Sequence, residues 1–206
     1  MTRPQLVSTV AKYYASKLAQ HGATPAGVDW NSEQSQRLRF DQFMELVSDR
    51  WASVCDYGCG YGALLDYLRA RGHQGEYVGF DVADAMISEA AISHETDRSA
   101  RFTSVRDDVP MVDFTIASGI FNVRLATPAD EWRAYVDETI CDLASRSRRG
   151  FGFNVLSSYS DPERRRNDLY YADPREVFDQ CMERWPRRVA LVHDYDLYEF
   201  TVTVRL

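Results

Sequence analysis

Short apolar runs alternate with amphipathic stretches from Trp51 to the end of the chain. Such runs predict buried strands, and apolar residues spaced three or four apart predict the helices between them. The predicted strands are residues 53–57, 76–81, 101–103, 114–118, 150–156, 190–193 and 198–205. The predicted helices are residues 63–71, 83–93, 131–145 and 174–184. This alternation is typical of an α/β fold, with a mostly parallel sheet and helices on both faces.

The last two predicted strands are too close together for a crossover helix. They must therefore pair as an antiparallel hairpin, which makes the final strand run against its neighbours. Residues 199–206 also alternate polar and apolar side chains, as expected of a strand that is covered on one face.

The first 48 residues read as a helical cap. Apolar or aromatic side chains recur there at helical spacing, at Val7, Val10, Tyr14 and Leu18. A break follows at residues 22–25, and a second helix begins near Ser32. We expect one domain over residues 1–206, with a cap or lid at 1–48 and a Rossmann-like core at 49–206.

Composition narrows the classes of partner. The chain has 206 residues, 45% of them apolar, and a net charge of −7, which disfavours an extended nucleic-acid surface. No apolar run is long enough to span a bilayer, and the first residues lack the apolar stretch of a secretory signal, so a cytoplasmic protein without a membrane partner is expected. The four cysteines lack zinc-site spacing, so we expect reduced thiols and no metal.

The strongest chemical signal is a glycine-rich turn after the first predicted strand. Asp56 ends that strand, and Gly58, Gly60 and Gly62 follow at alternate positions before a helix. Without β-carbons the turn lets a ligand approach the backbone, and the helix offers unpaired amides. Asp81 ends the next strand, nineteen residues after Gly62, where a carboxylate can accept hydrogen bonds from ribose hydroxyls.

On these residues the chain resembles the class I S-adenosylmethionine-dependent methyltransferase family, whose first motif is an acid, a spacer and a Gly-x-Gly-x-Gly turn. The likeness extends over residues 50–206, because the family has seven strands with an antiparallel last strand. It implies a Rossmann-like fold, the cofactor S-adenosylmethionine and transfer of its methyl group.

The resemblance also implies a cofactor-binding set. Asp56, Gly58 and Gly60, with Tyr57 and Cys59 in the same turn, line the methionine end, and Asp81 holds the ribose. Val82 and Met86 border the adenine, although plain core packing explains them equally well. The remaining expected contacts are Asp107 beside the adenine amino group, with a solvated loop as the alternative, Ser118 and Gly119 near the sulfonium, and Arg39 at the cofactor's carboxylate.

Ligands of open parallel sheets bind beyond the carboxyl ends of the strands, so polar residues at the strand exits are candidates for the acceptor site. Three are predicted to be catalytic: His193 as a base, Asn122 and Tyr195. The alternative for His193 is a hydrogen bond to Asp194, and methyl transfer also proceeds without a base when the acceptor is already nucleophilic. The expected substrate contacts are Tyr14, Trp30, Asn31, Asn154, Tyr159, Tyr170 and Tyr171.

We therefore expect a methyltransferase that acts on oxygen or nitrogen of a small polar metabolite. Arg164, Arg165 and Arg166 would suit an anionic acceptor, and an exposed charge run is their alternative. An NAD(P)-dependent oxidoreductase shares part of the glycine pattern, but Asp56 would place a carboxylate near its pyrophosphate. A non-catalytic module that binds S-adenosylmethionine stays open, as does the oligomeric state.

Overall fold

The computed structural model describes residues 3–206, and its core is a seven-stranded sheet in the order β3-β2-β1-β4-β5-β7-β6. Strands β1 to β5 pair in parallel, whereas β7 runs antiparallel to both β5 and β6. The expected α/β fold with a mostly parallel sheet and an antiparallel last strand is confirmed. The strands are β1 (Val54–Tyr57), β2 (Tyr77–Phe80), β3 (Ala100–Thr103), β4 (Val112–Ala117), β5 (Ser147–Leu156), β6 (Val189–Val192) and β7 (Glu199–Arg205).

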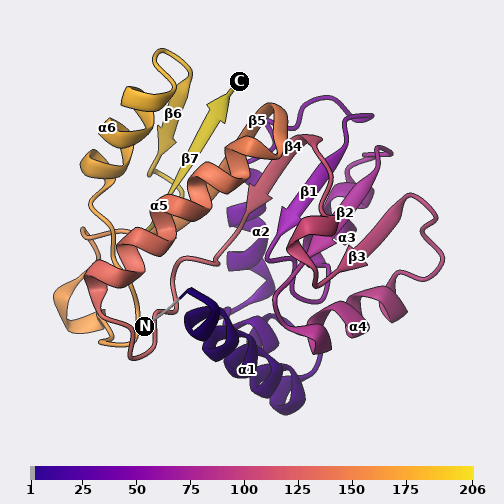
Figure 1. Ribbon diagram of the computed structural model, residues 1–206, viewed down its shortest axis with the longest axis horizontal. Coiled ribbons are helices and arrows are strands. Elements are labelled where there is room, and N and C mark those ends of the chain that lie inside the picture. Colours follow the sequence, from indigo (N-terminus) through magenta and orange to yellow (C-terminus); the bar gives the residue numbers. More distant parts are fainter. Residues whose placement is uncertain (1–2) are drawn as a thin grey trace.

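Helices cover both faces of this sheet and one of its ends (Figure 1). The helices are α1 (Arg3–His21), α2 (Glu33–Asp41), α3 (Ala63–Ala70), α4 (Asp84–Ser93), α5 (Ala129–Ser145) and α6 (Pro174–Arg184). Three short 3-10 helices lie in connecting segments of residues 3–206: η1 (Pro25–Val28), η2 (Arg106–Asp108) and η3 (Pro162–Arg164). None of the helices within residues 3–206 is long and apolar enough to cross a membrane.

The alternation of side chains along β5 separates two hydrophobic cores. Phe151 and Phe153 face α5 and α6, where Trp132 is fully buried. Gly150 and Gly152 face the other way, and the absence of side chains there leaves room for Phe43 and Leu46 from the segment after α2. The strand therefore packs tightly on both faces, as parallel sheets require.

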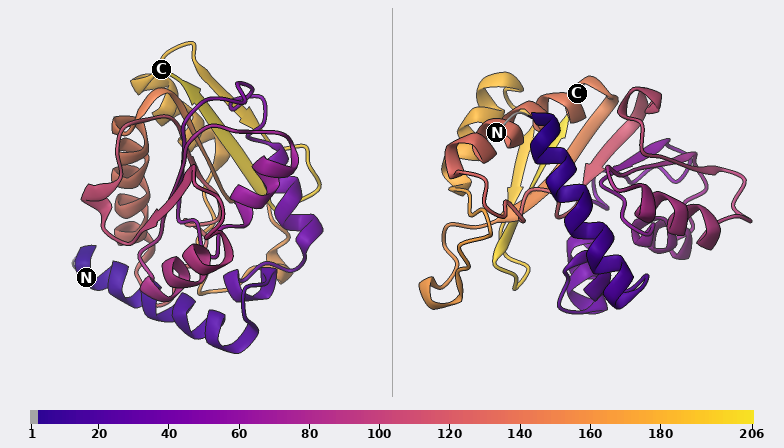
Figure 2. Two further views of the ribbon diagram at one scale, coloured as in Figure 1. Left: turned by 90° about the vertical axis from the view of Figure 1, so that its right-hand side faces the viewer. Right: turned by 60° about the horizontal axis from the view of Figure 1, so that its bottom comes forward.

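The cap differs in detail from the sequence expectation. The α1 helix forms over the predicted segment, but Leu6 is its one buried residue among those that the structure describes. The second helix starts as expected, because the Ser32 hydroxyl accepts a hydrogen bond from the amide of Ser35 and caps α2. Figure 2 shows α1 running across one end of the sheet, the end toward which β1 and β4 point in Figure 1.

A buried ion pair ties the cap to the last strand. The Arg39 guanidinium of α2 donates from Nε and Nη2 to the two carboxylate oxygens of Glu199 on β7, at 2.8 and 2.6 Å. Glu199 is 1% exposed, and Asn122 Nδ2 lies 3.4 Å from the same carboxylate. Ionised groups this deeply buried require such partners, because an uncompensated buried charge is costly.

We expect Arg39→Met to lower the free energy of unfolding by about 3–5 kcal/mol, because the Glu199 charge would lose its partner in the interior. The double variant Arg39→Met/Glu199→Leu should lose less than the single one, since both charges are removed together. Urea denaturation at neutral pH measures both values. Equal losses in the single and double variants would show that the two charges are not coupled.

Candidate active site

The turn after β1 lies close to two carboxyl groups, those of Asp81 and Asp56. Gly58, Gly60 and Gly62 all have positive φ, at 89°, 54° and 92°, which allows the chain to reverse within a few residues. The amide of Gly60 donates to Asp81 Oδ2 at 2.9 Å, and the amide of Ala83 donates to Asp81 Oδ1 at 2.9 Å. Asp81 therefore fixes the turn against the end of β2.

The second carboxyl group, Asp56, is buried beneath the turn. Its pKa is raised to about 7, chiefly because burial disfavours the charged form. The Tyr77 hydroxyl donates to Asp56 Oδ2 at 2.7 Å and acts in the opposite direction. Burial also raises the pKa of Asp81, and the amides of Ala83 and Gly60 oppose that shift.

A cleft opens above these groups, and we call it the first cleft. Its cavity volume of about 80 Å³ is well below the roughly 300–1,000 Å³ of typical ligand pockets. The cap closes it from outside with Val10, Tyr14, Val28 and Trp30. Ten of the predicted cofactor residues line it: Asp56, Tyr57, Gly58, Cys59, Gly60, Asp81, Val82, Met86, Ser118 and Gly119.

A second cleft of about 410 Å³ adjoins the first and shares Tyr14, Val28, Trp30 and Gly119 with it. The other residues of the second cleft come from the cap, the strand exits and the loop before α6. Those that the sequence singled out are Asn31, Arg39, Asn122, Arg164, Arg166 and Tyr171.

Trp30 and Gly119 form the wall between the two clefts. Gly119 has a φ of 85°, and a β-carbon there would lie 2.3 Å from Trp30 Cζ2, so neither the backbone nor the space admits a side chain. The Arg39 guanidinium lies over the Trp30 ring, with Cζ 3.9 Å from its centroid. Because Glu199 holds Arg39 in place, this cation–π contact also holds the Trp30 ring in its position in the wall.

Tyr14 is the residue of the shared wall with an ionisable side chain. Its pKa is raised well above the ordinary value, first by burial and then by the negative charge of Asp29. The phenol therefore stays protonated at neutral pH and is a hydrogen-bond donor rather than a base.

Charges in the second cleft are distributed unevenly. Asp29 accepts from the Tyr13 hydroxyl at 2.5 Å and pairs with Lys17 at 2.7 Å, which occupies both of its oxygens. Arg166 donates from Nε and Nη2 to the two carboxylate oxygens of Asp168, at 3.1 and 2.5 Å, whereas the Arg164 side chain is 69% exposed and lies 3.9 Å from Asp161. Among the arginines that line this cleft, Arg164 is therefore the one without a close carboxylate partner.

The third arginine of the run does not belong to this cleft. The Arg165 guanidinium donates to the backbone oxygens of Ser158 and Ser160, which stabilises the loop. Tyr171 does line the cleft, and its hydroxyl accepts the amide of Arg166 at 3.0 Å.

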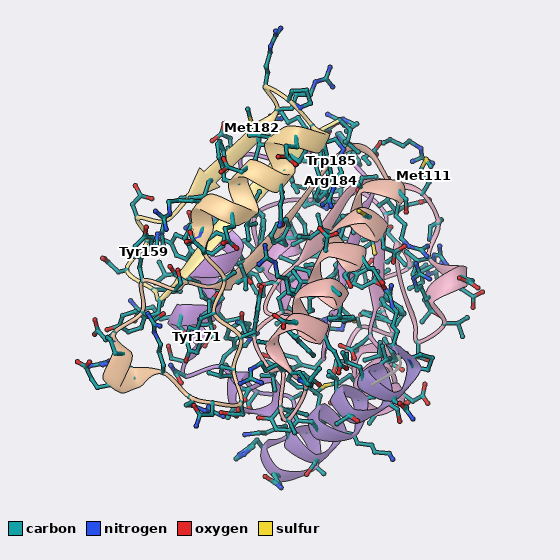
Figure 3. All side chains as sticks on the ribbon, turned by 60° about the vertical axis from the view of Figure 1, so that its left-hand side comes forward. Met111, Tyr159, Tyr171, Met182, Arg184 and Trp185 are labelled. Carbon is teal, nitrogen blue, oxygen red and sulfur yellow. The ribbon has the colours of Figure 1, made fainter. Side chains whose placement is uncertain are left out.

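Several predicted residues lie outside both clefts. Asp107 is exposed in η2, and Tyr170 packs against the core. His193 is exposed at the end of β6, with its ring 6.1 Å from that of Tyr159, which Figure 3 shows at the outer edge of the molecule. Tyr195 is buried, with its hydroxyl 3.0 Å from Thr201 Oγ1. The strand exits therefore do not all converge, because β6 is at the edge of the sheet.

Two predicted polar residues are engaged by the protein itself. Asn122 lines the second cleft, but its Oδ1 accepts the amide of Leu156 at 3.1 Å and its Nδ2 points to Glu199. Asn154 lies outside both clefts and is fully buried behind Gly119. Arg39 lines the second cleft and not the first, since Glu199 holds it there.

The sequence did not single out several residues that line the clefts. In the first cleft these are Gln36, Phe40, Tyr61, Ala63, Leu64, Phe80, Ile120 and Tyr135, besides Val10 and Val28. Tyr61 belongs to the glycine turn and was therefore within reach of sequence analysis. Tyr135 is on α5, and nothing in its helical context marks it. In the second cleft Glu199 is hidden inside an ordinary alternating strand.

Comparisons with known proteins identify the family. A family model described as a methyltransferase domain matches residues 30–165. A Mycobacterium tuberculosis protein named as a methyltransferase, Rv1506c, is 51% identical over 153 residues, which cover 74% of this chain and 92% of that protein.

Solved structures show the same fold at low sequence identity. Magnesium protoporphyrin IX methyltransferase from Synechocystis, crystallised with S-adenosylhomocysteine, has a TM-score of 0.67 at 16% identity and covers 96% of this chain and 98% of its own. A 1,6-didemethyltoxoflavin N1-methyltransferase from Burkholderia thailandensis, also with S-adenosylhomocysteine, has a TM-score of 0.68 at 17% identity, over 100% of this chain and 90% of its own.

These comparisons favour a methyltransferase over the oxidoreductase alternative, which was supported only by part of the glycine pattern. The chain belongs to the methyltransferase domain family, and it is an enzyme of the methyltransferase class.

Proposed function

We propose that this protein transfers the methyl group of S-adenosylmethionine, bound in the first cleft, to a small acceptor bound in the second. The observation that carries this proposal is the wall that the two clefts share, where Tyr14, Trp30 and Gly119 border both. A methyl donor and its acceptor must meet in line, and adjoining sites with a common border provide that arrangement.

The proposed cofactor roles are those that the resemblance to methyltransferases implies, for residues that line the first cleft. Asp81 holds the ribose hydroxyls, and Asp56 attracts the ammonium of the methionine end. Val82 and Met86 offer an apolar surface to the adenine, and Ser118 and Gly119 pass close to the sulfonium. Asp107 and Arg39 are left out of this set, because both lie outside the first cleft.

The small volume of the first cleft suggests that the cap has to open for the cofactor to bind. In this proposal α1 and η1 move away from the glycine turn to admit the cofactor, because the first cleft is smaller than a typical ligand pocket. Their return then excludes water from the reacting groups, which is the usual task of a lid.

Arg164, together with Arg166 once a ligand displaces Asp168, supports an anionic acceptor in the second cleft. Guanidinium groups bind carboxylate and phosphate through paired hydrogen bonds, and the carboxylate of Asp29 on the same cleft is already neutralised by its partners. Tyr14 can donate a hydrogen bond to the acceptor at the wall. His193 is outside the cleft, so positioning rather than proton removal carries the rate in this proposal.

Asp81→Asn should weaken the binding of S-adenosylhomocysteine by about 10- to 100-fold, because hydrogen bonds to a charged acceptor are lost. Isothermal calorimetry measures the dissociation constant. Asp84→Asn, an exposed neighbour on α4, is the matched control and should bind within about twofold of the parent. Unchanged binding by Asp81→Asn would show that Asp81 does not hold the cofactor. Titration of the parent protein with NAD should give no heat of binding.

The affinity for S-adenosylhomocysteine should rise with pH below neutrality. Asp56, with its pKa near 7, is mostly protonated at pH 6 and ionised at pH 8, and the ionised form attracts the ligand's ammonium. The association constant should grow by up to about tenfold per pH unit below 7, with proton release on binding. Calorimetry in buffers of different ionisation enthalpy measures that release. A pH-independent affinity that matches Asp56→Asn would contradict this role.

The acceptor should be recovered among anionic metabolites. Low-molecular-weight extract of the source organism, separated on an anion-exchange resin, is incubated with the enzyme and radiolabelled S-adenosylmethionine. The retained fractions should accept the label, and Arg164→Ala/Arg166→Ala should raise the KM for the active fraction by at least about tenfold, with unchanged cofactor affinity. Arg188→Ala, an exposed arginine before β6, is the control. Acceptor activity confined to the unretained fractions would exclude the anionic class.

A further inference from the structure

Asn154 lines neither cleft, but the oxygen and the nitrogen of its side-chain amide both bond to residues that line the first cleft. It is fully buried near the end of β5. Its Oδ1 accepts the amide of Gly119 at 2.7 Å, and its Nδ2 lies 3.1 Å from the Ser118 hydroxyl. These two partners are consecutive residues of the loop that follows β4, and both line the first cleft.

The position of Asn154 in the sheet explains why a side chain makes these bonds. The pairing of β4 with β5 ends at Ala117 and Phe153. One residue further along, the β4 chain leaves the sheet, and the amide of Gly119 pairs with the Asn154 side chain instead of a carbonyl of the β ladder. The Asn154 side chain replaces that ladder, so it fixes the direction in which the loop departs.

The loop needs this support because its conformation is demanding. Gly119 is held at positive φ, with Trp30 packed against its α-carbon, and a small rotation of the peptide would change both clefts. The Trp30 side of the wall is fixed through Arg39 and Glu199, as described above. Asn154 supplies the corresponding constraint from the other side.

We infer that Asn154 is a positioning residue for methyl transfer, which acts through Gly119 to hold the wall between the cofactor and acceptor clefts in its binding geometry. The inference rests on the proposed function of those clefts. Asn154 was predicted to contact the substrate, but in this inference it acts from behind Gly119 without touching a ligand. Loss of its two bonds would leave the Gly119 amide without a partner and would lower the fraction of molecules that are ready to bind.

The experiment compares three variants of the full chain. Asn154→Ala removes both bonds, and Asn154→Asp keeps an acceptor for the Gly119 amide. Thr115→Val is the matched control, because Thr115 and Ser147 form a buried hydrogen bond at 2.8 Å between the same two strands, away from the clefts. Each variant is measured for its Tm, its dissociation constant for S-adenosylhomocysteine and the hydrogen-exchange rate of the Gly119 amide.

Asn154→Ala should raise that dissociation constant and the exchange rate of the Gly119 amide by at least about tenfold, at a temperature well below its Tm. Asn154→Asp should recover most of the affinity even though its buried charge lowers the Tm. Thr115→Val should lose stability but keep its affinity within about twofold. This contrast separates positioning from stability alone.

Equal affinity of Asn154→Ala and the parent, with unchanged exchange at Gly119, would overturn the inference while leaving the proposed function standing. A loss of affinity in Thr115→Val as large as that in Asn154→Ala would also overturn the inference, because general destabilisation would then explain both losses. If the parent itself fails to bind S-adenosylhomocysteine, the proposed function fails, and the exchange rate of Gly119 still decides whether Asn154 holds the loop.

Discussion

The hydrogen bond from the Gly60 amide to Asp81 joins the two segments on which the first cleft is built. It connects the turn after β1 with the end of β2, and those strands are neighbours in the sheet. A carboxylate that accepts two backbone amides holds the turn open at positive φ, which the glycines tolerate. Without that bond the turn would lack its fixed distance from the strand beside it, and the first cleft would lose its floor.

Residues close in sequence could be predicted, and residues joined across the sheet could not. The glycine turn and Asp81 combine a local signal with a known strand spacing, so both were identified in advance, along with all seven strands. His193 was placed at the site from its position after a strand, but the strand order puts β6 at the edge of the sheet. That order follows from the packing of the whole chain, and no local pattern reports it.

The same limit applies to Arg39 and Asn154. The sequence suggested that both were polar residues with a binding task, and neither reading included a partner inside the protein. Arg39 meets a residue 160 positions away, and Asn154 meets one 35 positions away. The cost of burying polar groups guarantees that such partners exist, but only the tertiary structure says which groups they are.

The two ends of the cap are attached to different partners. Tyr13 and Lys17 bind α1 to Asp29, so α1 and η1 hold together, whereas Arg39 fixes α2 to the last strand. Trp30 lies between these two attachments, with its amide bonded to the Pro25 carbonyl of η1 and its ring stacked on Arg39 of α2. Because Trp30 borders both clefts, any movement of the outer cap that widens the first cleft would also change the shape of the second.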